Sequence, residues 1–329
     1  LAPLEALDPA LARALEGPAH GLPEEEGCAM VAAILGAAEA EIHFGEAVAA
    51  GFGRILTAGG RAWLATYREA VRRAGAQGAG IGLFVARHLP AVLLAGDPGL
   101  AAAFQSTLDR LAARGLFLLK EPLEVLERLL DTGDRAGARD FLTLLPAVLD
   151  RPLSYRLMGT LAHLVPQAVW ETPPEARGSR MAQLARLAQA DPGFLEPFLD
   201  GLERGLARLE PEGLERFVGQ ALETARGDRR AGLRFLALAS HRARRLCRRL
   251  QVAVSLEEVR APLAAYLRAR CGREIPLRPL AELPGAGRAE APSHPVVATD
   301  GRSLFLPAEI RAVPDREANL RLLEALARC

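Results

Sequence analysis

The side chains that most often do chemistry in proteins are scattered along this chain, without the spacing that a catalytic or metal site requires. The four cysteines contain no Cys-x-x-Cys pair, so neither a zinc ribbon nor a redox dithiol is expected. The histidines show no ligand-like spacing either, and we expect no metal and no cofactor. The residues concerned are His20, His43, His88, His163, His241 and His294, with Cys28, Cys247, Cys271 and Cys329.

Motifs of nucleotide-binding and hydrolytic enzymes are also missing. The chain contains no G-x-x-x-x-G-K-[ST], no H-E-x-x-H and no G-x-S-x-G. Gly78, Gly80 and Gly82 form a glycine-rich patch, but they follow no strand, so a turn between helices is favoured over a phosphate site. The run of three glutamates from Glu24 opens a predicted helix, where negative charge complements the helix dipole. The sequence therefore favours a protein that is not an enzyme and has no small-molecule substrate.

Positive charge is concentrated between residues 241 and 250. Apolar residues there recur at i, i+3, i+4 and i+7, which predicts a helix with one buried face and arginines around the rest. The arginines form a solvated face paired with neighbouring glutamates, a contact surface for an acidic protein, or a phosphate-binding surface for nucleic acid. The candidate partner surface consists of Arg242, Arg244, Arg245, Arg248 and Arg249.

Composition indicates which elements must position these arginines. The chain has 329 residues, of which half are hydrophobic and a quarter charged, and it is rich in the helix formers Ala and Leu. The net charge of +1, from 41 basic and 40 acidic residues, provides no overall attraction to nucleic acid or to an anionic membrane. No signal peptide and no apolar window of about 18 residues is present, so we expect a cytoplasmic all-α protein without a membrane partner.

Helical periodicity extends from the start to about residue 271 and is interrupted by short breaks rich in Gly, Pro and Asp. An Asp-Pro pair suits a helix start, because Asp caps free N–H groups and Pro lacks the N–H that would be unpaired. Examples of such breaks are at 59–60, 96–99, 132–134, 150–152, 172–174, 191–193 and 227–228.

The chain repeats itself at an offset of 94 residues. Asp97-Pro-Gly recurs at Asp191, and Gly133-Asp-Arg recurs at Gly227. Phe104, Arg110, Ala113, Arg114, Phe141, Leu142 and Leu144 recur in the same register without a gap. Two helix pairs of about 47 residues each fit this period, which is the size of HEAT-like units. We therefore predict an array of stacked helix pairs over residues 1–250, a fold whose usual task is to hold another macromolecule.

The pattern changes in residues 251–329. After a first helix, a loop or linker is expected over residues 272–291, followed by β-like runs at 295–298 and 303–306. Asp300-Gly301 between the runs predicts a tight hairpin turn. A last helix is expected from near Asp315, with Leu320, Leu322, Leu323 and Leu326 on one side. Because this helix ends without a cap signal at Cys329, we expect the natural chain to continue and supply its packing partner.

Four motifs in this region follow one another in a recognisable order. They read Ser-Leu-Glu-Glu-Val-Arg from Ser255, Tyr-Leu-Arg-Ala-Arg-Cys-Gly-Arg-Glu-Ile-Pro-Leu-Arg-Pro from Tyr266, Thr-Asp-Gly-Arg-Ser-Leu-Phe-Leu-Pro from Thr299, and Pro-Asp-Arg-Glu-Ala-Asn-Leu-Arg from Pro314. Residues 255–328 therefore resemble the segment of NorD/CbbO-type proteins that joins a helical region to a von Willebrand factor A domain. The helices before residue 255 match that family only in class.

The resemblance implies an adaptor that works with a MoxR-type AAA+ ATPase in the activation of a target enzyme. The family's A domain carries a D-x-S-x-S metal site, which this chain lacks; the nearest string, at Asp300, has the wrong spacing. Two alternatives remain open: a helical array that binds nucleic acid through the arginine face, and a hydrolase whose site is completed by a segment beyond this chain.

Overall fold

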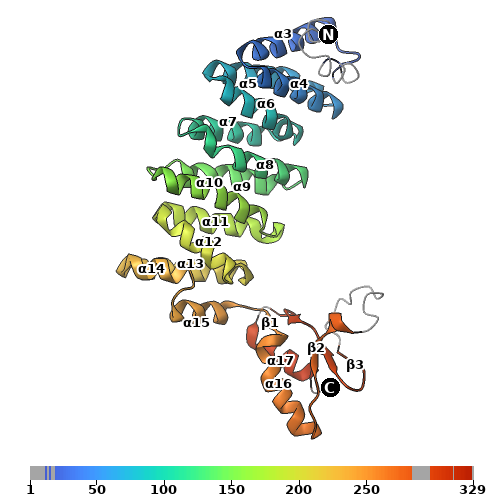
Figure 1. The fold of residues 1–329 in the computed structure, drawn as a ribbon, viewed down its shortest axis with the longest axis vertical. Helices are drawn as coiled ribbons and strands as arrows, with labels where there is room; N and C mark the ends of the chain where they lie inside the picture. The colour runs from blue at the N-terminus through green and yellow to red at the C-terminus, as the bar shows by residue number, and fades with distance from the viewer. Residues whose placement is uncertain (1–11, 13–14, 16–18, 284–296, 314, 328–329) are drawn as a thin grey trace. The chain divides into compact units, whose positions relative to one another are not determined.

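The chain forms an all-α helical-repeat fold, and among the described residues strands occur only from Val254 onward (Figure 1). The computed structural model describes residues 12, 15, 19–283, 297–313 and 315–327, which form two compact units, 1–199 and 200–329. Residues 200–250 belong to the second unit, and the expected domain boundary after residue 250 stays a prediction. Residues 284–291 of the expected linker, His294, the start of the first β-like run at 295–296 and Cys329 lie outside the described residues.

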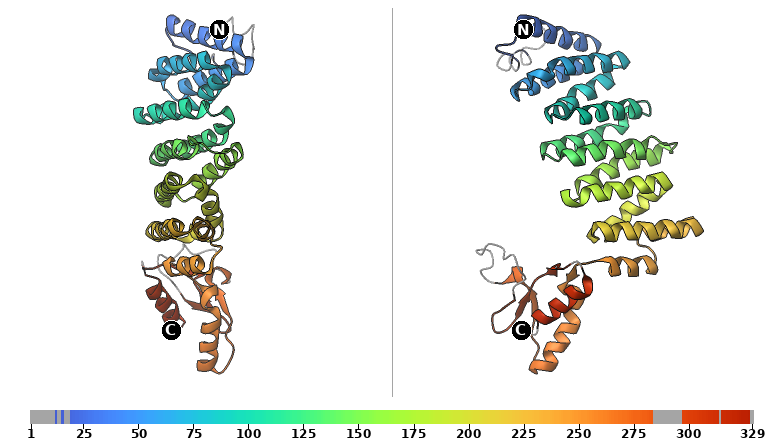
Figure 2. Two further views of the ribbon diagram at one scale, coloured as in Figure 1. Left: turned by 90° about the vertical axis from the view of Figure 1, so that its left-hand side faces the viewer. Right: turned by 180° about the vertical axis from the view of Figure 1, so that it is seen from behind.

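Most helices of the first unit begin or end at a predicted break, whereas the junctions at Glu41 and at residues 113–119 were not among the predicted breaks. Each packs against the next helix or the one after it, so that helix pairs stack in sequence order (Figure 2). The α-helices of this unit are α3 (Glu24–Ala40), α4 (Ile42–Thr57), α5 (Leu64–Gln77), α6 (Ala79–Leu94), α7 (Pro98–Ala112), α8 (Lys120–Asp131), α9 (Arg135–Leu149), α10 (Tyr155–Trp170) and α11 (Pro174–Ala190). Short 3₁₀ turns are η1 (Arg61–Trp63), η2 (Leu116–Leu118) and η3 (Pro192–Phe194).

Small residues allow the closest helix contacts in this unit. The hydroxyl of buried Tyr67 on α5 donates to the carbonyl of Ala86 on α6 at 3.0 Å and lies 3.3 Å from the carbonyl of Val48 on α4. A Cβ atom on Gly51 would lie 2.0 Å from that hydroxyl, so only glycine fits there. The buried Tyr67 hydroxyl, which water does not reach, thus links the three helices by hydrogen bonds.

The 94-residue repeat is visible in helix caps and buried phenylalanines. Asp97 caps α7, and Asp191 accepts the equivalent bond from Gly193 at the start of η3. Asp134 caps α9, and Asp228 caps α14 (Arg229–Leu236). The remaining helices of the second copy are α12 (Leu195–Glu203), η4 (Leu206–Arg208) and α13 (Pro211–Gly227), and Phe104, Phe141, Phe198 and Phe235 are all buried.

The two copies differ where the second one ends. α9 continues for 15 residues, whereas its counterpart α14 ends after 8. Leu238 then adopts a left-handed conformation with φ of 52°, and Ser240 starts a separate helix, α15 (His241–Leu250). The break separates α15 from α14.

The C-terminal part of the second unit contains α16 (Leu256–Cys271), α17 (Arg316–Leu326), η5 (Leu280–Glu282) and five short strands. The expected hairpin is present: β3 (Ala298–Thr299) pairs antiparallel with β4 (Leu304–Leu306). Asp300 accepts from the N–H groups of Arg302 and Ser303 at 2.8 and 2.6 Å, and Gly301 has a positive φ of 81°. These bonds fix the predicted turn.

Two strand pairings were not expected from the sequence. β2 (Leu277–Pro279), which lies inside the segment interpreted as a linker, pairs parallel with β4. Burial of Leu277 in the local core explains why this part of the segment is a strand. In addition, β1 (Val254–Ser255) pairs antiparallel with β5 (Glu309–Ile310).

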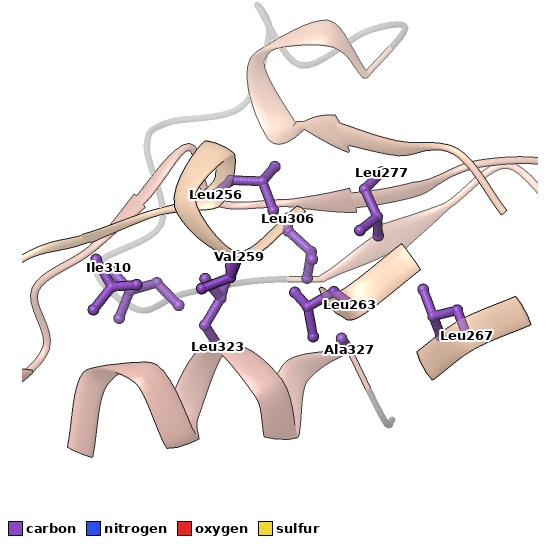
Figure 3. Packing of buried hydrophobic residues seen from close by; sticks show 10 residues of the cluster. Leu256, Val259, Leu263, Leu267, Leu277, Leu306, Ile310, Leu323 and Ala327 are labelled. Carbon is purple, nitrogen blue, oxygen red and sulfur yellow. The ribbon is translucent and has the colours of Figure 1, made fainter. Parts of the chain in front are cut away.

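The leucine stripe of α17 packs within this unit. Leu323 is fully buried and lies against Val259 of α16 and Ile310 of β5, as Figure 3 shows. Leu320, Leu322 and Leu326 pack against the same core. Asn319 is also buried, and its amide nitrogen donates to the carbonyls of Val252 and Val313 at 3.0 and 2.7 Å. The stripe therefore has a packing partner in the described part of the chain.

Candidate partner-binding surface

The candidate surface is built on α15, which forms as its sequence pattern predicts. The hydroxyl of Ser240 accepts from the N–H of Ala243 at 3.1 Å and starts the helix. Ala243 and Cys247 are buried, and Leu246 and Leu250 are half-buried. This apolar face attaches the helix to α13 and α14 and directs the arginines outward.

All five candidate arginines, Arg242, Arg244, Arg245, Arg248 and Arg249, are exposed. None of them forms an ion pair with any residue that the structure describes. The interpretation in which neighbouring glutamates neutralise this face therefore finds no support. Elsewhere pairing is common: Arg110 and Arg114 both bind Asp150, and they hold the pKa of that carboxyl below its usual value although burial opposes them. The α15 arginines differ because none of them is paired with a carboxylate of the described residues.

The neighbouring helices extend the positive surface. Residues 211–250 contain ten arginines and four acidic residues. Arg216 and Arg226 on α13 and Arg230 and Arg234 on α14 are exposed. Of these four, only Arg226 forms an ion pair with a described residue, Glu223 of its own helix. So many unpaired like charges raise the local potential and attract an anionic partner.

A cleft of about 640 Å³ opens at the end of α15. Arg216 and Arg249 line it from α13 and α15, and residues 311–313, 315 and 316 form a further wall. In that wall Arg311 binds Glu210 at 2.5 Å, so its charge is already matched. The cleft brings together arginines that are far apart in the sequence, and Arg216 and Arg311 could not be identified from any local motif.

Cys247 lies on the buried side of α15. Burial raises the pKa of its thiol, and the charge of Arg208 offsets this only in part. A thiol with a raised pKa is a weak nucleophile, so Cys247 serves packing.

The other residues considered for chemistry are dispersed. Among residues 19–283, 297–313 and 315–327, no three His, Cys, Asp or Glu side chains are placed to hold a metal ion. His43 binds Glu46 at 2.9 Å, which raises the pKa of the imidazole, and His163 binds Glu121 at 2.5 Å. Both are exposed surface pairs.

In the glycine-rich patch, Gly78 forms the predicted turn between helices, whereas Gly80 and Gly82 lie within α6. Gly78 has φ of 152° and separates α5 from α6. A Cβ atom on Gly82 would lie 2.4 Å from the Phe44 ring, so this glycine allows α4 and α6 to approach. The run from Glu24 forms the first turn of α3, and Arg61 binds Glu26 at 3.1 Å.

No protein-family model, curated protein or solved structure matches this chain. Among the described helices, none combines the length and the apolar character that a membrane crossing needs. The resemblance of residues 255–328 to NorD/CbbO-type proteins stays a prediction from their motifs.

Proposed function

We propose that this chain is a non-catalytic scaffold that binds an acidic protein partner through the arginine surface of α15. The observation that carries the proposal is the exposure of all five arginines without an ion pair among the described residues. Arginine presents a planar fork of donors that matches a carboxylate, so an unpaired, exposed cluster favours carboxylates of another protein. The stacked helix pairs support this role, because such arrays usually hold other macromolecules.

The partner that we propose is a MoxR-type AAA+ ATPase, which the scaffold links to a target enzyme in the cytoplasm. This choice rests on the resemblance of residues 255–328 to NorD/CbbO-type adaptors. In this arrangement the ATPase provides the energy and the present chain provides contacts, without a cofactor or a metal of its own.

Size-exclusion chromatography with light scattering tests the proposal, using the ATP-loaded MoxR-type ATPase of the same organism. We expect a co-eluting complex with fewer scaffold chains than ATPase subunits. The double variant Arg242→Glu/Arg245→Glu should weaken binding by about 10-fold or more, mainly through slower association at low salt. The control Arg273→Glu/Arg302→Glu changes the charge equally at exposed arginines outside the surface and should bind normally. Separate elution at low salt, or equal losses in both variants, would contradict the proposal.

A second candidate function is nucleic-acid binding. The observation that favours it is the spread of exposed arginines over three successive helices, α13 to α15, a spacing that can follow a phosphate backbone. Fluorescence anisotropy with a labelled duplex decides between the two functions. Micromolar affinity that falls steeply with salt would favour nucleic acid, and a flat titration at low salt would remove this candidate.

A further inference from the structure

The first described helices carry a surface of the opposite sign. Residues 24–53 contain six glutamates and no Lys or Arg, and they form α3 and most of α4. Glu26 and Glu46 are engaged with Arg61 and His43. The other four, Glu24, Glu25, Glu39 and Glu41, are exposed, and none has an ion-pair partner in the part of the chain that the structure describes.

This charge separation extends to the whole units. The first unit has 23 acidic and 18 basic residues, whereas the second has 17 acidic and 23 basic residues. The near-neutral total therefore conceals an acidic surface on α3 and α4 and a basic surface on α13 to α15. Surfaces of opposite sign steer encounters between molecules and fix their register.

The acidic surface also exposes an apolar side chain. Ile42 is 44% exposed and lies between Glu41 and His43 at the junction of α3 and α4. The charges of Glu41 and Arg87 both act on His43, so charged groups surround Ile42. An apolar side chain surrounded by charged groups is the usual arrangement of a protein–protein contact.

We infer that copies of this chain associate head to tail, with the acidic α3–α4 surface of one copy bound to the basic α13–α15 surface of another. The two surfaces differ, so the contact is heterologous and leaves one free surface of each sign on every dimer. Growth into longer oligomers follows at high concentration. Contacts made mostly by exposed charges are weak and screened by salt, so we expect association in the micromolar range.

Light scattering on the full chain tests the inference. At about 10 mM salt, where charges act over about 30 Å, the mean mass should rise with protein concentration. At about 1 M salt, where the range is about 3 Å, it should fall to that of the monomer. A monomeric mass at every concentration in low salt would overturn the inference.

Charge reversal identifies the surfaces involved. The acidic-surface variant Glu39→Arg/Glu41→Arg and the basic-surface variant Arg242→Glu/Arg245→Glu should each lose self-association. Mixed together, they should form a 1:1 dimer that does not grow, because only one attractive pair of surfaces remains. A chain with all four substitutions should stay monomeric, because two Glu and two Arg then balance on its first surface, which no longer attracts the second.

Matched controls separate this effect from net charge. Glu124→Arg/Glu175→Arg and Arg273→Glu/Arg302→Glu make the same charge changes at exposed residues outside the two surfaces. They should associate normally, and equal losses in these controls or no dimer in the mixture would overturn the inference. The acidic-surface variant should still bind the ATPase, so this test and that of the proposed function can fail independently.

Discussion

Asp134 pairs with Arg177, a residue of α11 whose side chain is only 5% exposed. The same carboxylate accepts from the N–H of Gly137 at 2.8 Å and caps α9. Arg177 also donates to the carbonyls of Val169 and Thr172 at 3.2 and 3.0 Å. One ion pair thus joins a helix start to the turn between two later helices.

This pair predicts unequal effects of equivalent substitutions in the two repeats. Asp134→Ala should lower the free energy of unfolding by about 3–5 kcal/mol, because it removes a cap and leaves a buried guanidinium without its carboxylate. Asp228→Ala should lower it by about 1 kcal/mol, since Asp228 caps α14 and pairs with no buried arginine among the described residues. Urea unfolding measures both. Equal losses would show that the Arg177 pair contributes little.

Gly51 should be the least tolerant glycine of the α4–α6 contact. In Gly51→Ala the new Cβ would meet the Tyr67 hydroxyl at 2.0 Å and the Ala86 carbonyl at 2.9 Å, so we expect a loss of about 1–3 kcal/mol. Gly36→Ala, on α3 where a Cβ meets nothing within 4 Å, should instead stabilise the chain by about 0.5–1 kcal/mol. Thermal unfolding of both variants is the measurement, and similar midpoints would contradict the close contact.

Glu127 should make stability depend on pH in the acid range. Burial alone would raise the pKa of this carboxyl, but His88 at 3.2 Å and Arg54 at 2.7 Å outweigh it and hold the pKa below its usual value. A lowered folded-state pKa gives stability that is present above the unfolded pKa of about 4.3 and is lost as the pH falls through the folded value. Glu127→Gln should therefore be less stable than the unaltered chain at pH 7, by about 1–3 kcal/mol.

That difference between Glu127→Gln and the unaltered chain should shrink as the pH falls below about 4. Urea unfolding at several pH values measures it. A difference that stays constant down to strong acid would mean that shape, and not the charge of Glu127, is responsible.

The rate at which the Cys247 thiol reacts should show whether its face of α15 is buried. Cys28 and Cys271 are exposed, whereas Cys247 is buried with a raised pKa. In a Cys329→Ser background, two thiols should react rapidly with an aromatic disulfide reagent and the third slowly, until denaturant exposes it. Three fast thiols in the native protein would mean that the face opposite the arginines is open.

Local features were the ones that the sequence predicted correctly. The Asp caps, the Asp300-Gly301 turn and the buried side of α15 each depend on residues within one or two turns of the chain. The 94-residue repeat in addition allowed the stacking of helix pairs to be predicted. Such signals are local because they arise from backbone N–H groups that nearby side chains satisfy.

Long-range relationships were missed. The parallel pairing of β2 with β4 joins Leu277 to Leu304, and a strand of three residues that ends in Pro279 has no periodicity to recognise. The cleft that contains Arg216, Arg249 and Arg311 depends on the angle of each intervening turn. Small rotations at Leu238 or at residues 251–253 would place these arginines elsewhere, and no local pattern encodes such angles.

The matching caps at Asp97 and Asp191 make residues 97–190 a cassette. The segment starts with an Asp-Pro-Gly turn, and the same turn directly follows its last residue. A second copy inserted before Asp191 would therefore keep a functional helix start at each junction. A single duplication in the gene can thus lengthen the array by one 94-residue repeat without any change in the turn sequences. The reach of the scaffold is therefore an easily evolved, and easily engineered, property.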